Sequence, residues 1–473
     1  MSMSLFLYAG AFSAFSMADS RMATSPSSFL IDGALEEYIS RAEKRHNSDF
    51  QFGEAVFGNS AQLNKGGDMK KWSDDEFISY SVGIGNGGPS ESVLENGHRI
   101  FETKEAVLDE STCNFLIEKA RETIKSRHDM DRSPDDDVGV TNSDLGEARL
   151  SQLPSDALEE LNILLQEQLY PMLTNRFGMY ELTVYDGLIL GNIAPSRSQP
   201  VHRDASMLTL NIALSSPDEF VQGGTYIEGL LDNDGLPLRI DRGKVLSHSS
   251  GIMHAGNAIT EGERWVLVLF VIAKNEPQTA RRTHAEGLDL IQSNLLPEAK
   301  SCFEAGLTAA PDDHLLHMGL GQIASMRGEE RESFRRLSKA SKLYPSSHKA
   351  AMAAGKILEG KRRSRAALRR FEEVLADVND KDMIDGAWMP LKALAWDARI
   401  CAGRCALLCA EIEAQKIDRS YRERTWTKNH LPKAIERLHI GLIPDPGDQY
   451  INSMLQRAEE LLEDANSYPG SSE

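Results

Sequence analysis

Cysteines, glycosylation sites and long apolar runs are scarce or missing in this chain, and each shortage excludes a class of protein. Only five of the 473 residues are cysteines, an odd and sparse set that does not make a disulfide framework. The sequence contains no Asn-x-Ser/Thr glycosylation site. The apolar run at residues 4–15 is too short to span a bilayer, so no integral membrane segment is expected.

The same apolar run bears on where the protein resides. Residues 4–15 have the length of a signal-peptide core, but no Lys or Arg precedes them. We therefore expect a cytoplasmic protein, with organelle or secretory targeting by this segment as the alternative.

Positive charge is also in short supply. The 52 Lys and Arg residues stand against 71 Asp and Glu residues, for a net charge of −19. Phosphate contacts need clustered Lys and Arg, so nucleic acid is not expected as a partner. The hydrophobic content of 41% is enough to build cores, and the length predicts two or three domains.

Residues 1–95 are predicted to be an irregular N-terminal segment that includes the candidate targeting peptide. Residues 83–88 match the GxGxxG pattern of dinucleotide-binding loops. That pattern requires a helix at its third glycine, and Asn96-Gly97 would end such a helix within two turns. We therefore interpret the glycine run as an ordinary loop.

Residues 96–275 combine helices with short strands. Helices are predicted at residues 109–126 and 155–177, with a polar loop containing Asp135-Asp136-Asp137 between them. Turn signals separate β-rich runs, which predict strands at residues 99–107, 184–193, 207–214, 225–228, 238–240, 244–247 and 264–273. Many short strands at this spacing favour a sandwich or barrel with helices packed on it.

Residues 280–473 are helical and repetitive. Small and large residues recur with a period of 34: Gly287, Gly321 and Gly355 in one series, and Phe303, Leu337 and Phe371 in the other. Small residues allow two helices to approach closely, and large ones fill the seam. The pattern resembles tetratricopeptide repeats (TPRs), with a fourth copy expected at residues 431–446 and a capping helix at 449–462. A plain helical bundle is the alternative.

Three of the cysteines lie in this helical part. Cys401, Cys405 and Cys409 are four residues apart, so on a helix they share one face. A metal site is one interpretation, and we prefer the other, in which they are small buried side chains.

Two histidines and an aspartate in the strand-rich part suggest a metal site. His202 and Asp204 are two residues apart, and His254 follows fifty residues after Asp204. Side chains two apart on a strand point to one face, and a barrel can bring a residue of a neighbouring strand beside them. Two histidines and one carboxylate form the facial triad that binds Fe(II).

Arg264 adds a cosubstrate to this interpretation. It precedes the apolar run 265–271, where a buried cation needs an anionic partner. An arginine can hold the far carboxylate of a 2-oxo diacid with a bidentate pair. The four residues together therefore predict an iron- and 2-oxoglutarate-dependent oxygenase. His248 competes for the role of second histidine, and we prefer His254 because it lies ten residues before Arg264.

Residues 98–274 resemble the catalytic domain of the prolyl 4-hydroxylase and procollagen lysyl hydroxylase superfamily. The resemblance is carried by residues 202–214 (HRDASMLTLNIAL), by Gly223-Gly224, and by residues 254–256 leading to 262–264. It implies a double-stranded β-helix (jelly-roll) fold with Fe(II) bound by His202, Asp204 and His254. It also implies 2-oxoglutarate on Arg264, and often L-ascorbate as an additional cofactor.

Three positions refine this resemblance. Asn211 is a candidate for orienting the cosubstrate, with strand pairing as its structural alternative. A tyrosine often found on the strand before the iron motif is not evident, and Gly191 and Asn192 stand near its place. Arginine at position 264, where the prolyl branch more often has lysine, favours a lysyl-like or more distant branch.

The expected protein is thus an α+β multidomain chain. A double-stranded β-helix oxygenase domain with flanking helices covers residues 96–275, and an all-α TPR-like domain covers 280–473. The expected reaction hydroxylates an unactivated C–H, on a prolyl or lysyl residue of a peptide or protein. It consumes O2 and decarboxylates 2-oxoglutarate to succinate and CO2, with no catalytic residue beyond the metal centre.

The role of the repeats leaves alternatives. Such stacks bind extended peptides, so they could present a peptide substrate or bind a protein partner. Alternatively, they scaffold a complex while the oxygenase acts on a free amino acid or another small molecule. A binding module with a vestigial oxygenase fold is a third interpretation, and the complete set of four residues argues against it.

Overall fold

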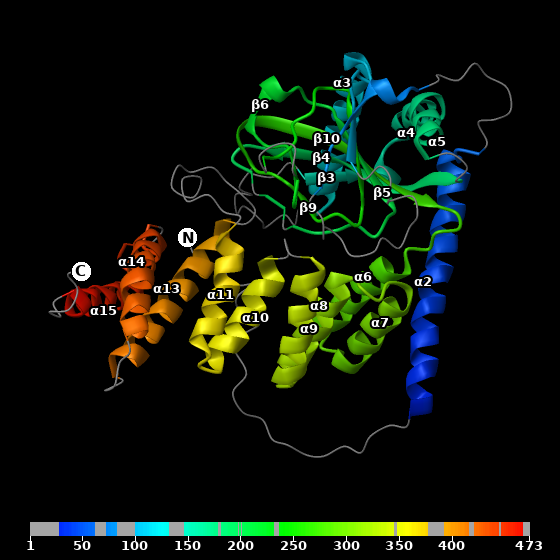
Figure 1. The fold of residues 1–473 in the computed structure, drawn as a ribbon. Coiled ribbons are helices and arrows are strands. Elements are labelled where there is room, and N and C mark those ends of the chain that lie inside the picture. Colours follow the sequence, from blue (N-terminus) through cyan, green and yellow to red (C-terminus); the bar gives the residue numbers. More distant parts are fainter. Residues whose placement is uncertain are drawn as a thin grey trace.

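The computed structural model describes residues 28–61, 72–82, 100–131, 146–177, 181–196, 198–199, 201–230, 236–344, 348–376, 392–415, 421–443 and 446–466. It is a mixed α and β protein with a helical, repeat-like C-terminal part. In Figure 1 the strands gather in one body, a row of paired helices lies along one side of it, and helix α2 runs beside both.

Most strands belong to one antiparallel sheet. Its order is β1-β2-β8-β5-β10-β4-β3, with β6 pairing to β10, while β7 and β9 form a separate two-stranded sheet. The strand bounds are β1 (Phe77–Ser79), β2 (Ile100–Thr103), β3 (Gly146–Arg149), β4 (Leu182–Ile193), β5 (Leu208–Ala213), β6 (Phe220–Gln222), β7 (Thr225–Ile227), β8 (Val245–Ser249), β9 (His254–Gly256) and β10 (Ile259–Ala273).

Strand prediction succeeded where the apolar runs were long. The runs 184–193, 207–214 and 264–273 correspond to β4, β5 and β10, although β10 begins earlier, at Ile259. The strand expected at residues 238–240 is wrong, because Leu238 makes only an isolated bridge to Thr225. A run of three residues buries too little apolar surface to distinguish a strand from a buried loop.

The two faces of β10 have different partners. Trp265, Leu267 and Leu269 point into the largest apolar core, together with residues of the flanking helices. These helices are α3 (Glu110–Asp131), α4 (Ser155–Leu164) and α5 (Tyr170–Phe177), and a π-helical turn at Leu165–Leu169 joins the last two. Because side chains alternate along a strand, the even-numbered residues of β10, including Arg264, face the opposite side of the sheet.

The C-terminal part consists of paired helices in a row (Figure 1). Helices α7, α9 and α11 start 34 residues apart, which is the period of the sequence pattern. The helices are α6 (Thr279–Gln292), α7 (Leu296–Ala309), α8 (His314–Met326), α9 (Glu330–Leu343), α10 (His348–Gly360), α11 (Ser364–Leu375), α13 (Lys392–Gln415), α14 (Tyr421–Gly441) and α15 (Gln449–Asn466).

The periodic glycines meet the periodic large residues. A Cβ on Gly287, Gly321 or Gly355 would collide with Phe303, Leu337 or Phe371, respectively. A glycine in one helix thus makes room for a large side chain of the next, which confirms the expected repeat-like packing. The cysteines of α13 are buried, as in our preferred interpretation. The fourth copy differs from the one expected at residues 431–446. Helix α14 begins ten residues before Leu431 and carries Pro432 inside it.

Helix α2 (Ser28–Phe57) corrects the expectation that residues 1–95 are irregular. Its Arg41 forms an ion pair with Glu286 of α6 at 3.0 Å. Near its other end, Gly53 lies so close to β4 that a Cβ would meet the carbonyl of Val184. These contacts of the helix are with distant segments, which local sequence does not show.

Three features of the sequence lie outside the described residues: the apolar run at 4–15, the glycine run at 83–88 and the acidic run at 135–137. Among the described helices, none is long and apolar enough to cross a membrane.

Candidate metal centre

The three expected metal ligands come from two backbone segments that pair with each other. His202 and Asp204 precede β5, and His254 opens β9. The amide of His202 donates to the carbonyl of His254 at 2.9 Å, and the amide of His254 donates back at 2.8 Å. The amide of Asp204 donates to the carbonyl of Ser250 at 3.0 Å. The ligand pair therefore lies in a bridged segment just before β5, near the strand end from which it was expected to reach the metal.

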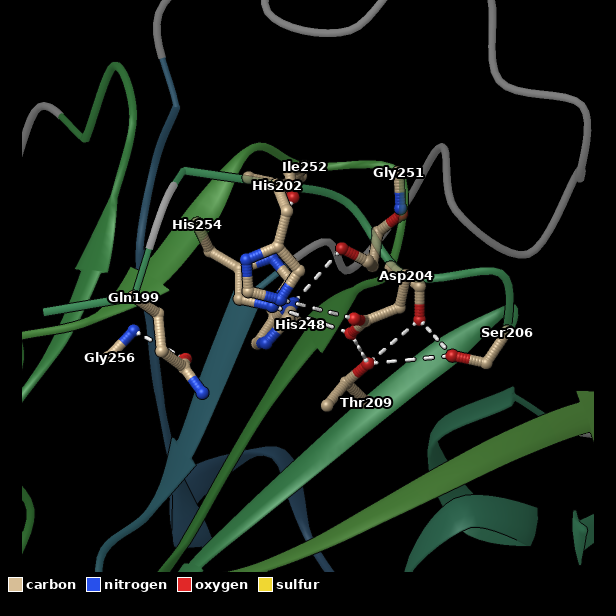
Figure 2. A network of polar contacts seen from close by, with 12 residues as sticks. Gln199, His202, Asp204, Ser206, Thr209, His248, Gly251, Ile252, His254 and Gly256 are labelled. Carbon is tan, nitrogen blue, oxygen red and sulfur yellow. Dashed lines mark hydrogen bonds and ion pairs between the residues drawn. The ribbon is translucent and has the colours of Figure 1, made fainter. Parts of the chain in front are cut away.

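The side chains of these residues converge (Figure 2). His202 Nε2 lies 3.6 Å from Asp204 Oδ1, and His254 Nε2 lies 3.4 Å from Asp204 Oδ2. One potential ligand atom from each residue lies within 4.8 Å of the other two. Atoms bound to one ion at about 2.1 Å and at right angles are about 3 Å apart. Small side-chain rotations would therefore bring all three ligand atoms onto one metal ion. The three residues thus fit a bound metal ion.

Hydrogen bonds hold two of the ligands in the orientation that metal binding needs. His254 Nδ1 lies 2.9 Å from the carbonyl of Ile252. A carbonyl can only accept, so Nδ1 carries the proton and Nε2 keeps its lone pair for a metal. Thr209 Oγ1 donates to Asp204 Oδ2 at 2.5 Å, and it also lies 2.9 Å from Ser250 Oγ. Thr209 and Ser250 thus support the carboxylate from outside.

The charges in the site reinforce one another. Burial alone would raise the pKa of Asp204, but the adjacent His254, with smaller contributions from His248 and His202, holds this pKa well below its usual range. Burial lowers the pKa of His254, and the Asp204 carboxylate more than offsets this effect, so the pKa rises. The carboxylate therefore stays ionised and attracts a cation, whether a proton on His254 or a metal ion.

His248 is a close neighbour of the site but not one of the three converging residues. Its ring lies 4.2 Å from the ring of His254, centroid to centroid, and its Nδ1 lies 3.1 Å from the carbonyl of Ser249. Burial, followed by the effect of His254, lowers the pKa of His248 to about 3. His248 is therefore a neutral, buried imidazole beneath the candidate ligands (Figure 2).

Arg264 is buried, and no described residue compensates its charge. The exposed fraction of this residue is 8%, and among the described residues no carboxylate pairs with its guanidinium. Burial, and secondarily the nearby Arg239, lowers the pKa of Arg264 to about 10, so the side chain stays charged at neutral pH.

Strand register puts Arg264 on the same side of the sheet as the metal residues. Arg264 and Val268 share one face of β10, and Val268 pairs with Asn211 of β5. Asn211 is two residues from Thr209, whose hydroxyl bonds to Asp204. Arg264, Asn211 and the support of the metal ligands thus face one side, opposite the apolar core.

Sequence reasoning missed Thr209 and Ser250, and it noted Asn192 only as lying near the place of an expected tyrosine. Asn192 pairs with Arg264 in the register of β4 and β10, so it too shares that face. The alternation of Thr209 and Asn211 with leucine and isoleucine was an available sequence signal for a polar sheet face. Nothing local marked Ser250, because its role arises from contacts with Thr209 and Asp204, more than forty residues earlier.

Comparisons with known proteins give no close match. No family model matches the chain, and no curated protein matches it. The similar solved structures each align with less than half of it. A MamA protein aligns with 40% of this chain and 86% of its own length, at 16% identity and a TM-score of 0.29.

Two oxygenases are among the similar structures. The non-heme α-ketoglutarate-dependent carbocyclase SnoK from nogalamycin biosynthesis covers 38% of this chain and 81% of its own, at 17% identity and a TM-score of 0.28. A 2OG-Fe(II) oxygenase family oxidoreductase from Burkholderia pseudomallei covers 26% and 61%, at 20% identity and a TM-score of 0.22. TM-scores this low do not establish a shared fold, so the function of this chain has to come from its own residues.

Proposed function

We propose that the chain is an Fe(II)- and 2-oxoglutarate-dependent dioxygenase that hydroxylates an unactivated C–H. The observation that supports this most directly is the convergence of His202, Asp204 and His254. One potential ligand atom from each lies within 4.8 Å of the other two, close enough to hold a single metal ion. Two imidazoles and one carboxylate are the ligand set of non-heme Fe(II) oxygenases, which keep further coordination positions open.

The binding of the cosubstrate is proposed to depend on Arg264. A buried cation without a counter-ion is costly, and an anionic ligand removes that cost. A dicarboxylate that reaches from the metal to Arg264 would supply the missing charge in a bidentate pair. Asn211 and Asn192, which share that face of the sheet, would donate hydrogen bonds to it.

We also propose that the strands form a double-stranded β-helix. The larger sheet would be one wall, and the β7–β9 pair would belong to the other. The bonded bridge between His202 and His254 joins the two, since His202 precedes β5 of the larger sheet and His254 lies in β9.

The metal, 2-oxoglutarate and O2 would supply the oxidising chemistry, with succinate and CO2 as products and L-ascorbate as an auxiliary reductant. The protein's own share is positional. His202, Asp204 and His254 hold the ion, Arg264 orients the diacid, and the buried surroundings of His254 and Arg264 limit the access of water.

The proposed substrate is a prolyl or lysyl residue of a peptide or protein, because the helical repeats provide a surface of the kind that binds peptides. A free amino acid or small molecule is the second candidate. It is favoured by the packing of Leu315, Met318 and Tyr344 of the repeats against Val201 and Met253, which occupies part of the repeat surface within the chain.

The first experiment measures succinate formation by the metal-free protein supplied with Fe(II) and 2-oxoglutarate. Wild type should form succinate only with both, and His202→Ala should form none; iron-dependent turnover by His202→Ala would refute the metal assignment. Mass spectrometry of candidate peptides and free amino acids after reaction should then show a gain of one oxygen on only one of the two substrate classes.

A further inference from the structure

The metal-ligand segments of the strand-rich part are held by side chains of the helical repeats. We propose that Asp313, acting through Arg203, and Arg281, acting on the backbone after Asp204, are positioning residues of the metal centre. In this view the repeats are part of the metal site's support and not a separate module tethered to it. The inference rests on the proposed metal site and identifies what fixes its ligands.

Arg203 stands between two of the ligands, and its side chain leaves the site towards α8. It forms a buried ion pair with Asp313, and the two side chains are 6% and 8% exposed. Asp313 is itself fixed, because its other oxygen accepts the amide of Leu316 at 3.0 Å and caps the start of α8. The backbone that carries His202 and Asp204 is therefore tied to the end of a helix.

The ion pair with Asp313 is the main compensation for the charge of Arg203. The Nε and Nη2 atoms of Arg203 are buried, and neither has a hydrogen-bond partner among the described residues. Removing the Asp313 charge would leave a buried guanidinium beside the metal ligands without a counter-ion. The side chain would then move to reach water, and the backbone between His202 and Asp204 would move with it.

Arg281 of α6 holds the same segment from a second helix. This residue is 4% exposed, and its Nη1 donates to the carbonyl of Ser206 at 2.6 Å. Ser206 Oγ lies 2.6 Å from Ser250 Oγ, and Ser250 bonds to Thr209, which bonds to Asp204. Gly251 leaves room for the arginine, since a Cβ there would lie 2.5 Å from Arg281 Nη2.

The segment that carries the third ligand also rests on the repeats. Met253, the residue before His254, packs in a small apolar cluster with Leu315 of α8 and Tyr344. Tyr344 donates to the carbonyl of Glu228 at 3.4 Å, and the amide of Glu228 donates to the carbonyl of Met253 at 2.9 Å. Contacts from the repeats thus reach both ligand segments.

A metal site is sensitive to groups that orient its ligands. Loss of such an outer contact typically weakens metal affinity by about 10- to 100-fold. A contact that only joins two parts of a chain would instead lower the melting temperature and leave the affinity of the folded protein unchanged. The two roles can therefore be separated by measuring metal binding on folded, full-length protein.

The test uses Co(II) titration of the full-length chain, followed by its visible absorption. Asp313→Asn retains an N-cap acceptor and removes the charge. The matched control is Asp312→Asn, at the residue next to Asp313. It removes an exposed carboxylate that pairs with Lys339 of α9 at 3.3 Å. We expect Asp313→Asn to weaken Co(II) binding by about 10-fold or more and to change the absorption spectrum, and Asp312→Asn to match wild type. Asp313→Glu, which restores the charge, should recover part of the affinity.

Wild-type affinity and spectrum in folded Asp313→Asn would overturn the inference. Should that variant not fold, Arg281→Lys is measured in the same way, and an unchanged affinity there would overturn it equally. Wild type and His202→Ala are titrated in parallel. Failure of wild type to bind Co(II) in a His202-dependent manner would refute the proposed metal site itself, which is a different outcome from an unaffected Asp313→Asn.

Discussion

His202 and His254 face each other across two reciprocal backbone hydrogen bonds, and their ring centroids are 4.6 Å apart. This pairing sets the separation of the two imidazoles before any metal arrives. It also explains why His254, and not the neighbouring buried His248, joins Asp204 in the candidate metal centre.

Replacing the two competing histidines should separate ligand from neighbour. His254→Ala removes an imidazole whose Nε2 points to Asp204, so metal affinity should fall by at least about 100-fold. His248→Asn should cost at most about 10-fold, because that residue packs against the ligand ring and is not one of the three converging residues. Isothermal titration with Co(II) checks both, and a larger loss for His248→Asn would reverse the assignment.

Arg264→Ala should act on the cosubstrate and not on the metal. Loss of a charge-assisted bidentate pair is worth about 1.5–3 kcal/mol, so the KM for 2-oxoglutarate should rise by about 10- to 100-fold. Arg264→Lys retains the charge but not the paired N–H donors of the guanidinium, so its KM should increase less. Succinate formation measured against 2-oxoglutarate concentration gives the result, and an unchanged KM for Arg264→Ala would remove the residue from this role.

Glu228 should make stability depend on pH. Burial, partly offset by Tyr344 and Lys349, raises the pKa of its carboxyl to about 8 in the folded protein. The folded state then binds the proton more tightly than the unfolded state, so this residue's contribution falls as pH rises from its unfolded pKa, about 4.3, towards 8. The slope is at most about 1.4 kcal/mol per pH unit.

Glu228→Gln removes that titration while retaining the shape. The difference in unfolding free energy between the variant and wild type should therefore shift in favour of the variant between pH 5.5 and pH 7.5. Urea unfolding at both pH values measures it. A difference that does not change with pH would show that Glu228 is not held protonated in the fold.

Two glycines of α10 provide a matched pair for the repeat packing. A Cβ at Gly355 would lie 2.5 Å from the Phe371 ring, so Gly355→Ala should destabilise by about 1–3 kcal/mol. Gly360 has nothing within 4 Å of such a Cβ, so Gly360→Ala should be neutral or stabilising by up to about 1 kcal/mol. Thermal unfolding of both variants checks the contrast, and equal effects would argue against the tight contact with Phe371.

Local patterns predicted a large part of this arrangement. The 34-residue period of Gly287, Gly321 and Gly355 anticipated the helix pairs, because each glycine meets a side chain only about sixteen residues away. Helix α2 was missed because its contacts are with Glu286 and Val184, far along the chain. The strand expected at residues 238–240 failed for a different reason, because a run of three residues buries too little apolar surface to distinguish a strand from a buried loop.

The residue types at 202, 204, 254 and 264, with their order and spacing, could be recognised from the sequence by itself, because ligand chemistry resides in the side chains. The sequence also showed which residues repeat. Only the tertiary structure decided which histidine joins Asp204, that Arg264 has no counter-ion among the described residues, and that Asp313 and Arg281 of the repeats hold the ligand segments. Those relationships join residues tens to more than a hundred positions apart, and only the folded backbone brings them within bonding distance.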